Sequence, residues 1–276
     1  MMAKPGTLRV SEDRGVSTIW IDNRRLRNAL TKDMWEQLPG LVNGLANDSH
    51  TRVIVLRGID GNFSAGADVE ALQDILHDAS TGRHDGGYTT KAEHALAACP
   101  KPTIAAIDGY CIGGGWQLAG ACDIRVASSG ATFGITPSKL GVIYPLSAIQ
   151  RLVELVGPAH AKYLLFSGDF IDAAAANRLG LVSVVVDGEL DAGLDRIVET
   201  LLSRSQLAME AMKDIVDVIV AGGDGLRARN EVWQREMAGS DDLAIGIQAF
   251  LEKRPPQFTW TGERFWKERA QYGWRR

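Results

Sequence analysis

Several features that define whole classes of protein are missing from this chain of 276 residues. Its three cysteines, Cys99, Cys111 and Cys122, include no CxxC pair and no histidine at ligand spacing, which excludes a disulfide framework and a zinc site. No window approaches the roughly 20 uninterrupted apolar residues of a membrane span, and the N-terminus lacks the apolar stretch of a secretory signal. We therefore expect a soluble cytoplasmic protein with reduced thiols and no membrane partner.

Charge of one sign is not concentrated anywhere. Lys and Arg total 30, Asp and Glu total 34, and both kinds are scattered along the chain without a basic block. Nucleic acid is therefore not an expected partner. Neither GxGxxG with a following acidic residue nor GxxxxGK followed by Ser or Thr occurs, so nucleotide-binding motifs are missing as well. No histidine pair has i, i+4 spacing, so we predict no metal site. We expect no resident cofactor either.

Glycine is abundant, with 30 residues that fall mostly between apolar runs, and 45% of the chain is hydrophobic. Short β-branched runs alternate with segments of helical spacing, which is typical of an α/β protein. The expected strands are residues 17–21, 53–56, 103–107, 124–127 and 181–186. The expected helices of this part are residues 31–45, 115–122, 147–156 and 173–179.

The pattern changes near residue 189, after which apolar residues recur almost continuously at helical spacing to residue 251. We therefore divide the chain into an α/β core, residues 1–190, and a C-terminal helical region, residues 191–276. Four tryptophans lie late in the chain, and aromatic side chains are enriched at subunit interfaces, which favours an oligomer. They are Trp233, Trp260, Trp266 and Trp274.

Two glycine-rich segments, residues 61–68 and 107–118, each follow an expected strand and lead into a helix-like run. This order leaves unpaired backbone N–H groups at a helix start, where an anion can bind. Two such donors that converge on one oxygen would form an oxyanion hole for a thioester enolate. Alternatively, the glycines only permit tight turns.

These segments resemble the two signature segments of the crotonase (enoyl-CoA hydratase/isomerase) superfamily, and the resemblance covers nearly the whole chain. Its other motifs, in the order of the chain, are residues 28–30, 122–124, 133–134, 140–141, 150–152, 168–182 and 249–254. The resemblance implies a spiral of ββα turns with a C-terminal helical region that trimerises, often as a dimer of trimers.

The resemblance also implies a site for an acyl-CoA, which enters as the substrate thioester. The N–H groups of Ala67 and Gly114 would bind the thioester oxygen, and Arg25 and Arg27 would lie near the CoA nucleotide, where basic side chains suit phosphates. Both arginines are alternatively surface charges, and Glu70 stands where hydratases often carry Lys. The acyl-CoA path would be lined by Ala65, Gly66, Ala67, Asp68, Val69, Glu70, Gly113 and Gly114.

Two departures from the hydratase pattern change the expected chemistry. Hydratases of the family use two glutamates as an acid/base pair, and this chain has Gln117 and Ser138 at those positions. An amide does not titrate and a hydroxyl is a very weak acid, so ordinary hydration is not expected. Ser138 beside Lys139 could form a nucleophile and base, but adjacent side chains usually point apart.

Decarboxylation of a short malonyl-type acyl-CoA needs the least from acid/base groups, because loss of CO₂ itself generates the enolate. Residues 140–144 are similar to the methylmalonyl-CoA decarboxylase branch, which has a tyrosine at the position of Tyr144. That branch can carry His where this chain has Ala67. Alternatively, Tyr144 only packs in a turn. Gln117 either hydrogen-bonds a substrate carboxylate or amide or is a satisfied helix residue.

Two alternatives remain open at this stage: a hydratase or isomerase with other acid/base residues, and a protein that binds acyl-CoA without turnover. Other acid/base residues could come from residues 73–94, a polar stretch that we predict to be a flap beside the acyl pocket. It contains His77 and His84, which either approach the substrate on closure or lie on the surface.

Overall fold

The computed structural model describes residues 6–77 and 85–268 and contains two sheets. The larger sheet has six strands in the order β1-β2-β3-β4-β6-β9. β1 and β2 pair antiparallel and the other neighbours pair in parallel. The strands are Thr7–Asp13 (β1), Val16–Asp22 (β2), Val53–Gly58 (β3), Thr103–Ile107 (β4), Ile124–Ser128 (β6) and Val184–Val186 (β9).

The smaller sheet has three short strands, β5 (Tyr110–Ile112), β7 (Thr132–Gly134) and β8 (Phe170–Asp172). β5 and β7 each follow a strand of the larger sheet and precede a helix. The two resulting units are β4, β5 and α4 (Gly114–Ala121), and β6, β7 and α5 (Leu146–Ser167). The expected spiral of ββα turns is therefore confirmed.

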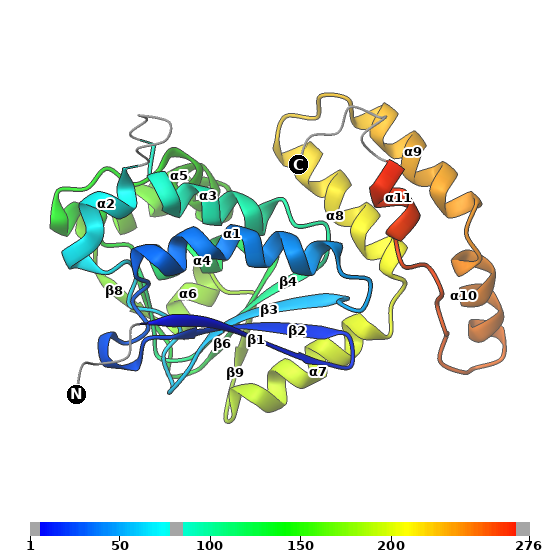
Figure 1. Ribbon diagram of the computed structural model, residues 1–276, viewed down its shortest axis with the longest axis horizontal. Helices are drawn as coiled ribbons and strands as arrows, with labels where there is room; N and C mark the ends of the chain where they lie inside the picture. Colours follow the sequence, from blue (N-terminus) through cyan, green and yellow to red (C-terminus); the bar gives the residue numbers. More distant parts are fainter. Residues whose placement is uncertain (1–5, 78–84, 269–276) are drawn as a thin grey trace.

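Helices cover both faces of the larger sheet (Figure 1). α1 (Lys32–Asn47), α3 (Gly87–Ala97), α4 and α5 lie over one face, and α7 (Leu190–Leu202) lies under the other. α1 buries Met34, Leu38 and Val42 at spacings of four residues, which places them on one face of the helix. α7 packs its buried leucines against the strands of the sheet. The two short helices α2 (Leu72–Leu76) and α6 (Ala173–Leu179) complete this part.

The remaining helices extend to one side of the core: α8 (Gln206–Val220), α9 (Leu226–Ala238), α10 (Asp242–Leu251) and α11 (Glu263–Glu268). Trp233, Trp260 and Trp266 pack with Phe265 in a cluster of their own, and the Trp233 and Phe265 rings are 4.3 Å apart. These three tryptophans therefore pack among the C-terminal helices of the same chain. The sequence had suggested them as candidates for a subunit interface. Trp274 lies outside the described residues.

Most expected elements agree with the observed ones, but the helix expected at residues 147–156 extends as α5 to Ser167, across a kink at Gly157. The strand expected at residues 181–186 is shorter, because only Val184–Val186 pair in the sheet. Of the stretch 73–94, expected as a flap, residues 73–76 belong to α2 and residues 87–94 to α3, while residues 78–84 lie outside the described residues. Among the described helices, none has the length and apolar character needed to cross a bilayer.

Candidate functional site

The two glycine-rich segments lie side by side at one edge of the spiral. The N–H of Phe63 donates to the carbonyl of Asp108 (2.7 Å), and the N–H of Ser64 donates to the carbonyl of Tyr110 (2.8 Å). In return, Ile112 donates its N–H to the carbonyl of Ser64 (3.0 Å). These bonds continue the parallel pairing of the small sheet and fix the first segment against the second.

Asn28 and Leu30 hold the first segment from its other side. The Asn28 amide nitrogen donates to the carbonyls of Ile59 (2.8 Å) and Asn62 (2.7 Å). The N–H of Leu30 donates to the carbonyl of Gly66 (2.7 Å), and the carbonyl of Leu30 accepts from the N–H of Asp68 (2.9 Å). Ala67 lies between these two bonds, so its own N–H remains available.

The N–H groups of Ala67 and Gly114 lie close together where the segments meet. A methyl group on Gly114 would be 3.2 Å from the Ala67 nitrogen, and one on Gly66 would be 3.2 Å from the Gly114 nitrogen. Neither N–H donates to an oxygen within the described ranges. Gly66 and Gly113 have φ angles of +107° and +53°, which favour glycine and turn the backbone toward this point.

This arrangement can bind an anionic oxygen. Gly114 is the first residue of α4, so its N–H is one of the unpaired donors at the positive end of a helix. Two fixed backbone donors beside each other stabilise charge that develops on a carbonyl oxygen during a reaction. The geometry therefore agrees with the oxyanion hole expected from the sequence.

Gln117, one turn further along α4, contacts a carboxylate that sequence reasoning missed. The Gln117 amide nitrogen donates to Oε2 of Glu93 on α3 over 2.8 Å. Ser147 Oγ donates to the same oxygen (2.7 Å), and Arg151 Nε lies 3.5 Å from Oε1. Glu93 is completely buried, and Gln117 retains 3% of its exposure. Glu93 lies with Thr89 and Leu96 on the buried face of α3, a face too polar for an apolar helix pattern to reveal it in the sequence.

Tyr144 lies beside the start of α4. Its hydroxyl donates to the carbonyl of Gly113 over 2.8 Å, next to the Gly114 donor. Burial first, and then the negative charge of Glu93, raise the pKa of Tyr144 well above its usual 10. The phenol therefore remains protonated near neutral pH and acts as a hydrogen-bond donor.

Ser138 and Lys139 do not form a nucleophile and base. The Ser138 hydroxyl donates to the carbonyl of Phe166 (3.3 Å), whereas the Lys139 ammonium lies 5.0 Å from the centre of the Phe170 ring. The alternative that paired these two side chains is therefore wrong. His77 directly follows α2, and His84 lies outside the described residues.

The expected acyl-CoA path runs from the interior to the surface. Gly66 is buried, Ala65, Ala67 and Asp68 are half-buried, and Val69 and Glu70 are exposed. The Asp68 carboxylate accepts from the N–H of Glu70 and thereby caps the short 3-10 helix Val69–Ala71.

Arg25 and Arg27, which precede these residues in the sequence, are both exposed. The Arg27 guanidinium lies over the Tyr110 ring, 4.8 Å from its centre. Arg25 has no ion-pair partner in the part of the chain that the structure describes. Both side chains are therefore placed where an anionic ligand could reach them.

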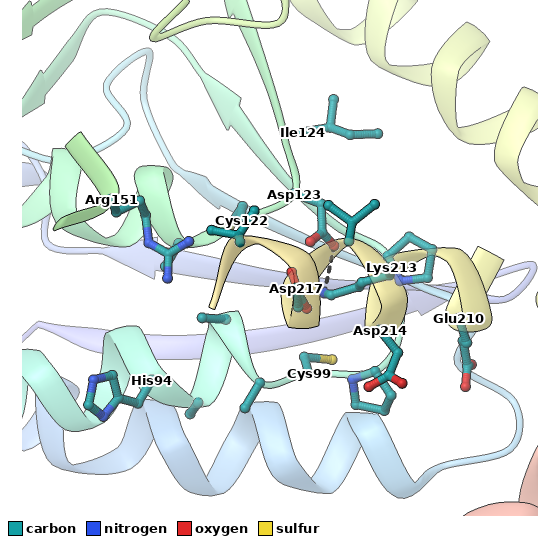
Figure 2. Close-up of a pocket in the computed structure, with 18 of the residues that line it drawn as sticks. His94, Cys99, Cys122, Asp123, Ile124, Arg151, Glu210, Lys213, Asp214 and Asp217 are labelled. Atoms are coloured by element: carbon teal, nitrogen blue, oxygen red, sulfur yellow. Dashed lines mark hydrogen bonds and ion pairs between the residues drawn. The ribbon is translucent and has the colours of Figure 1, made fainter. Parts of the chain in front are cut away.

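One cavity of the molecule lies apart from these donors. It has a volume of about 1530 Å³ and lies between α8 and the helices α1, α3, α4 and α5, with neither Ala67 nor Gly114 in its wall. Figure 2 shows Lys213 of α8 reaching Asp123 across it, at 2.7 Å. Cys99 and Cys122 also line it. Burial raises the pKa of Cys122 to about 12, so this thiol is not a nucleophile near neutral pH.

Comparisons with known proteins agree with this geometry. Residues 11–261 match the model of the enoyl-CoA hydratase/isomerase family. The crotonyl-CoA hydratase of Syntrophomonas wolfei is 33% identical, over 90% of this chain and 96% of that protein. The peroxisomal Delta(3,5)-Delta(2,4)-dienoyl-CoA isomerase of Arabidopsis thaliana is also 33% identical, over 91% of this chain and 95% of that protein.

A solved structure extends the likeness to the fold. A crystal structure of an enoyl-CoA hydratase/isomerase family member is 40% identical, covers 93% of this chain and 99% of its own, and superposes with a TM-score of 0.88. The likeness spans the ββα spiral and the motifs at the two glycine-rich segments. The chain therefore belongs to the enoyl-CoA hydratase/isomerase family and is an enzyme that acts on CoA thioesters.

Proposed function

We propose that this enzyme decarboxylates a short malonyl-type acyl-CoA through an enolate held at Ala67 and Gly114. The observation that supports this most is the combination of two available backbone donors with residues at positions 117 and 138 that do not titrate near neutral pH. Such a site stabilises an enolate but supplies no base there to form one by proton abstraction. Loss of CO₂ removes that requirement.

The reaction breaks one bond and forms another. The bond between the α-carbon and the carboxylate breaks, CO₂ leaves, and the electron pair passes into the thioester to give the enolate. The N–H groups of Ala67 and Gly114 bind the oxygen that becomes negative. The enolate then takes a proton, supplied by solvent water, at its α-carbon. We assign assistance in this transfer to the Tyr144 phenol, whose hydroxyl must first release the Gly113 carbonyl.

The rest of the substrate would extend from this point to the surface. Residues 65–70 provide a continuous path from the buried Gly66 to the exposed Glu70. Arg25 and Arg27 would meet the phosphates of the nucleotide end, because guanidinium groups bind phosphate strongly. The flexible reach of two exposed arginines suits a ligand end that lies in solvent.

Hydration or double-bond isomerisation is the second candidate, and the contact between Glu93 and Gln117 favours it. The Glu93 carboxylate oxygen lies 2.8 Å from the Gln117 amide nitrogen. It is therefore close to where the carboxylate of a glutamate at position 117 would lie. Such a group could transfer a proton if Gln117 moved aside. Two of the relatives are named as a hydratase and an isomerase of CoA esters.

One experiment separates these candidates. The purified protein is mixed with crotonyl-CoA and methylmalonyl-CoA, and the CoA species are followed by mass spectrometry. Propionyl-CoA should appear while crotonyl-CoA remains unchanged. Addition of water to crotonyl-CoA would instead select the second candidate. Survival of both substrates, with tight binding of either, would point to an acyl-CoA-binding protein.

We also propose that the C-terminal helices form a homotrimer or a dimer of trimers. α10 exposes Leu243, Ile247, Phe250 and Leu251 in one stripe, with Phe250 84% exposed. Contiguous apolar surface of this kind usually marks an interface. Light scattering at micromolar concentration should give the mass of a trimer or a hexamer, and a monomer would refute the proposal.

A further inference from the structure

The amide of Gln117 has a defined orientation. A carboxylate accepts hydrogen bonds, so the amide nitrogen must face Glu93 and the amide oxygen must face away from it. That oxygen receives no hydrogen bond within the described part of the chain. The Gln117 amide oxygen is also not sealed from solvent, unlike a buried polar atom that has no partner. An acceptor at the end of Gln117 is therefore open to space beside α4.

This acceptor lies on the same side of α4 as the oxyanion donor. Gly114 and Gln117 are three residues apart, so they share a face of the helix. Their separation along the axis is about 4.5 Å, and helical side chains lean toward the N-terminus. An acyl group whose thioester oxygen binds at Gly114 thus places its α-carbon and substituents beside the Gln117 oxygen.

Glu93 places negative charge next to the Gln117 amide. Within the described ranges its carboxyl oxygens are contacted only by donors, an arrangement that stabilises negative charge: Gln117 Nε2, Ser147 Oγ and Arg151 Nε. The arginine is the farthest of the three, at 3.5 Å, and its side chain is 31% exposed, so it neutralises the charge only in part. The site is thus positive at the start of α4 and negative one turn later.

We propose that Glu93 is a positioning residue that locks the Gln117 amide with its oxygen toward the acyl group, so that the site opposes a bound carboxylate and favours its departure as CO₂. The inference rests on the proposed decarboxylation. During that reaction, negative charge moves from the substrate carboxylate to the thioester oxygen, which is from the negative end of the site to the positive end. Glu93 makes no direct contact with substrate in this scheme and forms no bond.

The test uses Glu93→Gln, which keeps the shape of the side chain and removes its charge. At an effective dielectric constant of about 20, charges several ångströms apart interact strongly enough to change an equilibrium by about 10- to 100-fold. We expect kcat for methylmalonyl-CoA to fall by about that factor, while KM stays equal or decreases. A decrease in both constants is the signature of lost ground-state opposition. Glu199→Gln, the same change at an exposed position of α7, serves as the matched control.

A second measurement does not depend on turnover. Succinyl-CoA carries a carboxylate whose loss would not give an enolate, and butyryl-CoA has no carboxylate. Calorimetry should show that Glu93→Gln binds succinyl-CoA about tenfold more tightly than wild type. Binding of butyryl-CoA should not change. If the wild type leaves methylmalonyl-CoA intact, the proposed function fails, and this binding comparison alone decides the role of Glu93.

Three results would overturn the inference. Equal weakening of both CoA esters would make Glu93 a purely structural residue, and an unchanged kcat would remove its link to the reaction. Turnover of crotonyl-CoA by the wild type that disappears in Glu93→Gln would make Glu93 a proton-transfer group. If Glu93→Gln does not fold, Gln117→Leu replaces it: this change removes the acceptor, and kcat should again fall without an increase in KM.

Discussion

Replacing Gly114 by alanine should close the oxyanion hole without removing a residue that the fold needs. The added methyl group would stand 3.2 Å from the Ala67 nitrogen, in the space where that N–H would meet a substrate oxygen. Loss of one such donor lowers kcat by about 10²- to 10³-fold, which corresponds to about 3–4 kcal/mol of transition-state stabilisation. We expect this loss in the conversion of methylmalonyl-CoA to propionyl-CoA.

The effect of Gly114→Ala on stability should be much smaller. Its methyl group would also approach Cζ2 of the buried Trp35 to 2.9 Å, and such overpacking typically costs about 1–3 kcal/mol. Alanine offsets a small part of this, since the preference of about 1 kcal/mol for alanine over glycine in a helix interior is reduced at the first residue of α4. A thermal melt should therefore move by only a few degrees.

Gly120→Ala is the matched control for this experiment. Gly120 also belongs to α4, but a methyl group there would meet its nearest neighbour, Trp116, at an ordinary 3.5 Å and would reach neither donor. This variant should keep the wild-type rate. If Gly114→Ala folds as well as Gly120→Ala and turns over substrate at the same rate, the assignment of Ala67 and Gly114 as the oxyanion donors is wrong.

Three further predictions concern the surroundings of the hole. Tyr144→Phe should lower kcat by about 10²-fold. Because the pKa of Tyr144 is raised well above 10, the wild-type rate should show no loss from phenol ionisation up to pH 10. Gln117→Glu places a second carboxylate against Glu93. Its free energy of unfolding in urea should be about 1–3 kcal/mol lower than that of the double variant, in which Glu93→Gln restores an amide–carboxylate pair. Equal stabilities would contradict the role of that contact. Phe250→Ser should shift the light-scattering mass toward the monomer.

The parts of the fold that the sequence predicted are those with long local signals. β3 and β4 contain the apolar runs of residues 53–56 and 104–107, each flanked by polar residues, and α6 was predicted with its observed bounds. The strands of the smaller sheet have three residues each, which is too short for an alternating pattern to be recognised. α3 begins at two consecutive glycines and carries polar residues along much of its length, which favoured the interpretation as a loop.

The site divides in the same way. Ala67 and Gly114 were predicted because their donors are backbone groups set by glycine patterns that are local in sequence. Glu93 was missed because its partners are 24, 54 and 58 residues away, and no local pattern relates them. A glutamate in a polar stretch is normally solvated, and only the assembled packing of α3 against α4 and α5 buries this one.

The difference between backbone and side-chain groups also explains how the chain can lack both hydratase glutamates and keep an enzyme's site. The proposed oxyanion donors depend on the positive φ angles of Gly66 and Gly113 and on the start of α4, so we expect them to persist as long as the fold does. Acid/base groups are side chains and can be replaced one at a time. At position 117 the replacement is tied to Glu93, because an amide there is the neutral partner that a buried carboxylate accepts. In this chain the carboxylate beside the proposed enolate site therefore belongs to α3, and α4 contributes its neutral partner.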